Sequence, residues 1–171
     1  MKKIIILLSL ALVSWGALAQ NSQKIQPSIK IEKSTSASAI IDNYLSMKDA
    51  LVKEDSKTAA SFGKVLFGTF PKFDASELTS QQKNEVAKII KGATQQAKYI
   101  ADHSEDIALQ RQHFEYLTKS IKELIVLAGS DRPLYQAYCP MYNNNTGGAW
   151  LSMSKEISNP YFGSKMLKCG S

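Results

Sequence analysis

The sequence predicts a mainly α-helical fold, an up-down bundle of three to four helices followed by an irregular C-terminal segment. Between residues 39 and 128, apolar side chains recur at spacings of three, four and seven, which is the period of one face of a helix. After Pro133 that period disappears, and aromatic and sulfur-bearing side chains crowd the rest of the chain. The links between helical stretches are short, so successive helices are expected to be antiparallel neighbours in one domain over residues 39–171.

The first two helices are bounded by capping residues and a breaker. The first is expected to begin at Ala39, with Ser36 or Ser38 as its cap. A break near Asp55–Ser56 separates it from a second apolar block, which Pro71 stops because proline has no amide proton to donate.

Two longer helices follow. Ser76 is expected to begin the third, with Glu77 in the first turn, where the helix dipole favours negative charge, and this helix can reach Asp102. Ser104 is expected to cap the fourth helix, and Gly129 is expected to end it.

Residues 134–171 form a segment rich in cysteine, methionine and aromatic residues. The run Asn143–Gly148 is typical of a turn and can join Leu134–Met141 to Ala149–Met153 as a short β-hairpin. Because a two-stranded hairpin is marginal alone, we expect this segment to pack onto the helical bundle.

The N-terminal nineteen residues have the pattern of a secretory signal peptide. Two lysines precede an apolar run, and the small-x-small pattern of Ala17 and Ala19 marks a cleavage site. Cleavage would leave 152 residues in the periplasm or outside the cell and would lower the net charge from +6 to +4. Residues 20–38 are polar and are expected to be a flexible N-terminal segment.

Composition excludes several functional classes. The lysines are scattered, with no concentrated basic stripe, which argues against nucleic-acid binding. After the N-terminal apolar run, the sequence contains no second apolar stretch that approaches twenty residues, so no membrane insertion of the mature chain is expected. Two histidines are too few for a large histidine cluster, and no glycine-rich phosphate loop or pair of catalytic carboxylates is visible. We therefore expect a protein that is not an enzyme.

Cys139 and Cys169 are the only cysteines in the chain, and their chemistry has two alternatives. An exported protein with one pair of cysteines usually oxidises it, and closing a loop of this length would stabilise the fold by roughly 3–4 kcal/mol in the chain-entropy model. The other alternative is a metal site.

Each cysteine has a methionine at a spacing that can share its face. Cys139 and Met141 would point the same way along an extended strand, and Met166 and Cys169 would do so in a helical turn. Thiolate and thioether ligands favour Cu(I). His113, at the edge of the apolar stripe of the fourth helix, is the candidate nitrogen ligand.

Several motifs of this chain resemble those of a known family. They are Tyr44–Leu45, Lys48–Leu51, Gln110–Phe114, Tyr138–Met141, Gly148–Ser152, Ile157–Gly163 and Lys165–Gly170. Over roughly residues 40–170 the chain resembles the bacterial exported domain of unknown function family 3347. The Cys-Pro-Met element is also similar to that of small heavy-metal-binding modules, which usually have histidine next, whereas this chain has Tyr142.

The resemblance implies a function in metal handling, because members of that family occur alone or joined to periplasmic adaptors of copper and silver efflux systems. It implies a periplasmic protein that binds Cu(I) or Ag(I) for heavy-metal efflux or resistance. The implied partner is an efflux adaptor or another envelope protein, and His113 becomes the substitute for the missing histidine. The alternative is a non-catalytic interaction module of the cell envelope, stapled by a disulfide between Cys139 and Cys169.

Overall fold

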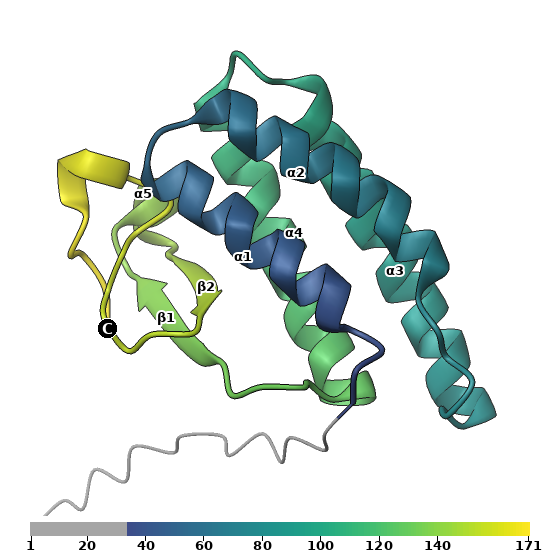
Figure 1. The fold of residues 1–171 in the computed structure, drawn as a ribbon. Helices are drawn as coiled ribbons and strands as arrows, with labels where there is room; N and C mark the ends of the chain where they lie inside the picture. The colour runs from purple at the N-terminus through teal and green to yellow at the C-terminus, as the bar shows by residue number, and fades with distance from the viewer. Residues whose placement is uncertain (1–33) are drawn as a thin grey trace, which may run out of the picture.

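The computed structural model describes residues 34–171 (Figure 1). Its helices are α1 (Ser38–Val52), α2 (Ser56–Thr69) with the 3-10 turn η1 (Phe70–Lys72), α3 (Ser80–Asp102) and α4 (Ile107–Ala128). The C-terminal part contains β1 (Tyr135–Cys139), the short α5 (Tyr142–Asn145), β2 (Gly148–Ser152) and η2 (Gly163–Met166). The predicted bundle, with four helices and a short hairpin, is confirmed.

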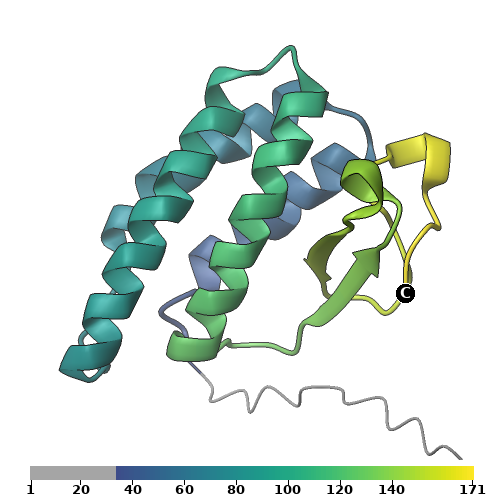
Figure 2. The same cartoon turned by 180° about the vertical axis from the view of Figure 1, so that it is seen from behind.

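Successive helices pack against one another, and the C-terminal segment covers a face that they leave open. α1 lies on α2, α2 on α3 and α3 on α4, while β2 contacts α4 and α1. Figure 2 shows that α3 and the hairpin lie on opposite sides of α4. Side chains from both faces of α4 are therefore buried, one set against a helix and the other against the hairpin.

The two strands are antiparallel, with Tyr135 opposite Ser152 and Cys139 opposite Gly148. One hydrophobic cluster joins the helices to the hairpin, and its largest fully buried side chains include Tyr44, Phe114 and Trp150. Within the part of the chain that the structure describes, no helix is both long and apolar enough to cross a bilayer.

Two helix starts differ from the predicted ones. Helix α3 begins after Thr79 rather than at Ser76, because Thr79 and Gln82 form a reciprocal capping box. Helix α4 begins after Asp106 rather than Ser104, because the Asp106 carboxylate accepts the amide proton of Leu109. In both places the residue that captures a free amide of the first turn decides where the helix begins.

The predicted signal peptide and most of the predicted flexible segment lie outside the described residues. The end of that segment, residues 34–38, has a defined conformation. Ala37 is fully buried in the hydrophobic cluster, and the amide of Ser38 donates to the carbonyl of Thr35. The flexibility of residues 20–38 stays a prediction, and the burial of Ala37 places the end of that segment against the hydrophobic cluster.

Gly63 lets α2 and α3 approach closely. A Cβ atom at this position would lie 2.8 Å from the carbonyl oxygen of Ala97 and 2.9 Å from the amide nitrogen of Ala101. Both atoms belong to the backbone of α3, so a side-chain rotation could not relieve the clash. By contrast, a Cβ at Gly92, inside α3, would meet no atom within 4 Å.

We predict opposite effects for Gly63→Ala and Gly92→Ala. Gly63→Ala should lower the free energy of unfolding by about 1–3 kcal/mol, because the two helices must move apart. Gly92→Ala should raise it by about 0.5–1 kcal/mol, because alanine has the better helix propensity. Urea unfolding followed by circular dichroism measures both, and a neutral Gly63→Ala would contradict the close approach.

Candidate functional site: the C-terminal segment and its thiol pair

The hydroxyl of Tyr44 joins α1, α4 and β2 at one buried point. It lies 2.8 Å from the hydroxyl oxygen of Thr118 in α4 and accepts the amide proton of Leu151 in β2 at 3.0 Å. Burial raises the pKa of the Tyr44 phenol far above its usual range, although both hydrogen bonds lower it. The hydroxyl therefore stays neutral and fixes the hairpin against two helices.

Aromatic rings fill the space around this hydrogen bond. Tyr44 stacks on Phe114 of α4, with ring centroids 5.1 Å apart. Phe114 contacts Tyr161, which in turn meets Trp150 of β2 edge to face and stacks on Tyr142 at 4.1 Å. Such pairs add to the free energy gained from burial alone. Trp150 and Tyr161 thus form the contact with the bundle, whereas Tyr135 and Tyr138 of the same segment are exposed.

Asn159 organises the end of the chain. Its side-chain amide donates to the carbonyl of Cys169 at 2.8 Å, and its side-chain oxygen accepts the amide proton of Tyr161 at 2.8 Å. Its backbone amide donates to the carbonyl of Leu167. Because Asn159 is fully buried, these bonds replace its contacts with water and fix the backbone that carries Cys169.

Arg111 anchors the same segment to the helices from the other side. Its guanidinium donates to the carbonyls of Pro160 at 2.8 Å and Leu51 at 3.3 Å, and it lies 3.7 Å from the Glu54 carboxylate. The hydroxyl of Ser164 donates to the other oxygen of Glu54. The hydrogen bond from Ser164, more than the nearby Arg111 charge, lowers the pKa of Glu54.

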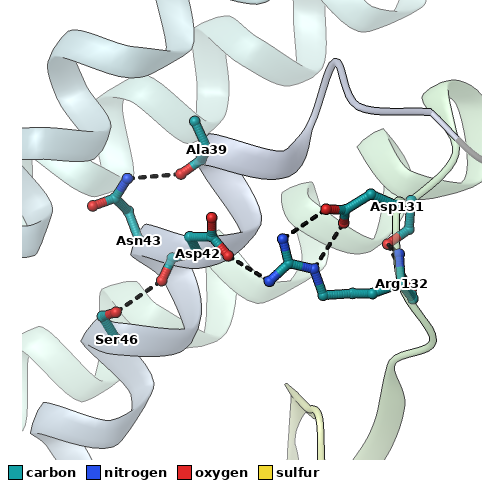
Figure 3. A network of polar contacts seen from close by, with 7 residues as sticks. Ala39, Asp42, Asn43, Ser46, Asp131 and Arg132 are labelled. Atoms are coloured by element: carbon teal, nitrogen blue, oxygen red, sulfur yellow. Dashed lines mark hydrogen bonds and ion pairs between the residues drawn. The ribbon is translucent and has the colours of Figure 1, made fainter.

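A second arginine positions the link between α4 and β1. Figure 3 shows the guanidinium of Arg132 between two carboxylates, paired through two nitrogens with Asp131 and through the third with Asp42 of α1. The Arg132–Asp42 distance is 2.6 Å. This bridge ties the link before β1 to helix α1.

Cys139 and Cys169 come together although thirty residues separate them. Their sulfur atoms lie 3.1 Å apart as two free thiols, whereas a disulfide bond is about 2.05 Å long. Cys139 ends β1 and is fully buried, while Cys169 is half-buried. Beyond Cys169, Ser171 exchanges two backbone hydrogen bonds of 3.0 Å with Tyr138, which holds the end of the chain along β1.

The two thiols have different electrostatic surroundings. Burial opposes ionisation of Cys139, but the thiol of Cys169, the amides of Met141 and Tyr142 and the side chain of Asn159 outweigh it, so the pKa of Cys139 is lowered. The hydrogen bond to Cys139, together with burial, raises the pKa of Cys169. The surroundings of Cys139 thus favour its ionised form, and those of Cys169 favour its neutral form.

The other predicted metal ligands are Met141, Met166 and His113, which lie near the surface of the C-terminal segment or on the side of α4 that faces α3. Met141 is half exposed after β1, and Met166 ends η2, where its carbonyl accepts the amide proton of Cys169. His113 faces α3: its Nδ1 is 2.7 Å from the side-chain oxygen of Gln96, and its ring stacks on Tyr99 at 4.5 Å.

His113 therefore does not join the cysteines, and the predicted ligand set of five side chains is not assembled. The physical reason is helical geometry, because its neighbour Phe114 takes the direction that faces the C-terminal segment and His113 is rotated toward α3. Within residues 34–171 no three histidine, cysteine, aspartate or glutamate side chains are grouped so as to hold a metal ion.

Sequence reasoning missed the residues that position the thiols. Tyr44 and Arg111 are polar groups among the apolar residues of α1 and α4, a signal that suits a buried hydrogen bond. Asn159 stands before Pro160, a pair of residues that is typical of a turn. Its side-chain contacts with residues two and ten positions away cannot be inferred from spacing.

A model of the family described as "Protein of unknown function (DUF3347)" matches residues 40–132. The chain belongs to this family. The match spans α1 to α4 and ends at Arg132 in the link before β1, so the DUF3347 match confirms the expected resemblance for the helices and leaves the thiol pair outside it. No curated protein and no solved structure matches the chain.

We predict that Tyr44→Phe lowers the free energy of unfolding by about 1–3 kcal/mol, because the Thr118 hydroxyl and the Leu151 amide lose a buried partner. The control is Tyr116→Phe, since 48% of the surface of Tyr116 is exposed. Denaturant unfolding of both variants tests this, and equal stabilities would exclude Tyr44 as the junction.

We predict that His113 makes stability depend on pH. Burial, helped by the charge of His103, lowers the pKa of His113, so the unfolded chain binds a proton more readily than the folded one. Stability is then complete above the unfolded pKa of about 6.5 and falls as the pH drops through the folded pKa. His113→Gln should show a smaller loss of melting temperature between about pH 7.5 and 5.5. An unchanged loss would contradict this prediction.

Proposed function

We propose that the reduced protein binds Cu(I) or Ag(I) through the thiolates of Cys139 and Cys169. The observation that supports this proposal is the 3.1 Å separation of the two sulfur atoms, which the fold brings together from distant parts of the chain. Two thiolates form a soft ligand pair, and soft ligands select Cu(I) over harder divalent ions. The expected role is that of a periplasmic protein in heavy-metal efflux or resistance, with an efflux adaptor as a partner.

The surroundings of the pair suit a bound cation that stays accessible. A metal ligand must be a thiolate, and the amides of Met141 and Tyr142 with the Asn159 side chain favour the charged form of Cys139. Cys169 is half-buried, which leaves an approach for an ion or for a partner that delivers it. Met141 and Met166, next to the cysteines in sequence, are the candidate third ligands, and His113 is withdrawn.

A disulfide-stapled, non-catalytic interaction module of the cell envelope is the second candidate. The same short distance favours it, since the sulfur atoms need only approach by about 1 Å to form a bond. Such a bond would fasten a segment that Asn159, Arg111 and Tyr44 already hold in place. The matched family is described only as one of unknown function, and this description favours neither a catalytic nor a non-catalytic role.

We predict that the reduced wild-type chain withdraws one Cu(I) from a chromogenic chelator in an anaerobic titration. Cys139→Ser and Cys169→Ser should each abolish this competition, because one thiolate cannot hold the ion against a chelator. His113→Ala is the matched control and should compete like the wild type. Met141→Leu and Met166→Leu report whether a thioether adds to the pair. Equal competition by Cys139→Ser and wild type would rule the site out.

A thiol count separates the two candidates. The protein is extracted from the periplasm under denaturing conditions into an alkylating reagent, so that air cannot oxidise it afterwards, and its mass is measured. Two alkylated cysteines support the metal-binding function. An unalkylated chain that is lighter than the reduced chain by two hydrogen atoms supports the disulfide staple. If the chain is oxidised and a mild dithiol reductant does not restore Cu(I) binding, the metal-binding proposal fails.

A further inference from the structure

A pocket of about 340 Å³ lies between α1 and the loop that follows β2, and the thiol cysteines take no part in it. One wall comes from the last two turns of α1, including Lys48, and the other from residues 152–158. Its volume falls within the range of small-molecule sites, which combine an apolar lining with a few convergent polar groups.

Lys48 is the residue in this pocket that calls for an explanation. Only 7% of its surface is exposed, although lysine is almost never fully buried without a partner. Its ammonium group lies 2.5 Å from a carboxylate oxygen of Asp49, whose own side chain is 58% exposed. One carboxylate at the surface satisfies at most part of an ammonium group with three protons to donate.

Most of the other deeply buried polar side chains hydrogen-bond to residues of the fold, although the side-chain oxygen of Gln110 has no partner among the described residues. Four of these buried polar side chains lie outside the pocket and hydrogen-bond to other residues of the fold, namely Gln110, Thr118, Ser130 and Asn159. Lys48 has no comparable role, since breaking its pair with Asp49 would release no element of the fold. The burial of the Lys48 ammonium group is therefore better explained by a ligand in the pocket than by a role in holding the helices together.

Serine hydroxyls on the opposite wall add donors to the same pocket. The oxygen of Ser152 accepts the amide proton of Ser154, and the oxygen of Ser154 accepts that of Glu156. With their oxygens used in this way, both hydroxyl protons remain to be donated, and within the described residues neither has an acceptor. Ser158 supplies a third hydroxyl and Lys53 a second ammonium group, while the exposed Glu156 adds a second carboxylate beside that of Asp49, which like Asp49 can turn into solvent.

We propose that this pocket binds a small organic oxyanion, a carboxylate or a phosphate ester, with a short apolar body. The oxyanion would take the ammonium group of Lys48 and the serine hydroxyls, which all donate. The apolar body would lie on Leu45, Val52 and the half-exposed Met153. Asp49, whose side chain is 58% exposed, would turn into solvent, and the bound oxyanion would replace it as the counter-charge of Lys48.

The proposal is tested by titrating the full chain, uniformly labelled with ¹⁵N, with hexanoate and separately with glycerol phosphate. We expect at least one probe to shift the amide signals of residues 152–158 and of the end of α1 along a saturating curve. Lys48→Met keeps the aliphatic stem and removes the charge, so it should weaken binding at least roughly tenfold. Lys98→Met, on the exposed face of α3, is the matched control and should bind like the wild type.

Two further measurements keep the test decisive. Ser158→Ala removes one donor and should weaken binding several-fold even if Lys48→Met proves unstable. Vesicles with phosphatidylglycerol that shift the same signals, when soluble glycerol phosphate does not, would assign the oxyanion to a lipid headgroup. Failure of all these probes to saturate, or equal binding by Lys48→Met and wild type, would overturn the proposal. Neither result depends on Cu(I) binding at the thiol pair.

Discussion

The buried hydroxyl of Tyr44 is the interaction on which the rest of the structure depends. It comes from α1, lies beside Thr118 of α4 and accepts the amide proton of Leu151 in β2, so three elements distant in sequence share one oxygen atom. A buried amide in a strand must find a partner, and here that partner is a helix side chain rather than another strand. The hairpin is therefore seated on the bundle by a directional bond, and the rings of Phe114, Tyr161 and Trp150 close around it.

The two cysteines meet because hydrogen bonds and packed rings hold the hairpin and the C-terminal segment on the bundle. Cys139 ends the strand next to β2, and Cys169 lies on a segment that Asn159 holds by its side chain and Arg111 holds through Pro160. The backbone pair of Ser171 with Tyr138 also brings the two cysteines together. The distance between the sulfur atoms is thus a property of the whole junction between bundle and tail, and reduction, oxidation or metal binding would act on parts that are already in position.

The helices could be predicted from sequence because burial on one face repeats with the helical period. The starts of α3 and α4 could be predicted less well, since other possible capping residues lie near Thr79 and Asp106. Only the side chain that accepts an amide proton of the first turn decides where each helix begins. A single pair of cysteines in a chain with an export signal predicts that Cys139 and Cys169 meet, in a disulfide or at a metal. The direction of His113 could not be inferred, because a residue at the edge of an apolar stripe can turn to either neighbour, and here Gln96 and Tyr99 of α3 receive it.

The pairing of Ser171 with Tyr138 has a consequence for solubility. An outer strand presents unpaired amides and carbonyls that can join a strand of another molecule and begin aggregation. In this protein Ser171 pairs with that edge of β1 at Tyr138 through two hydrogen bonds, and Gly170 fits there because a side chain would strike Trp150. The polypeptide thus covers part of the outer edge of its own hairpin, at the point where another strand could otherwise join it.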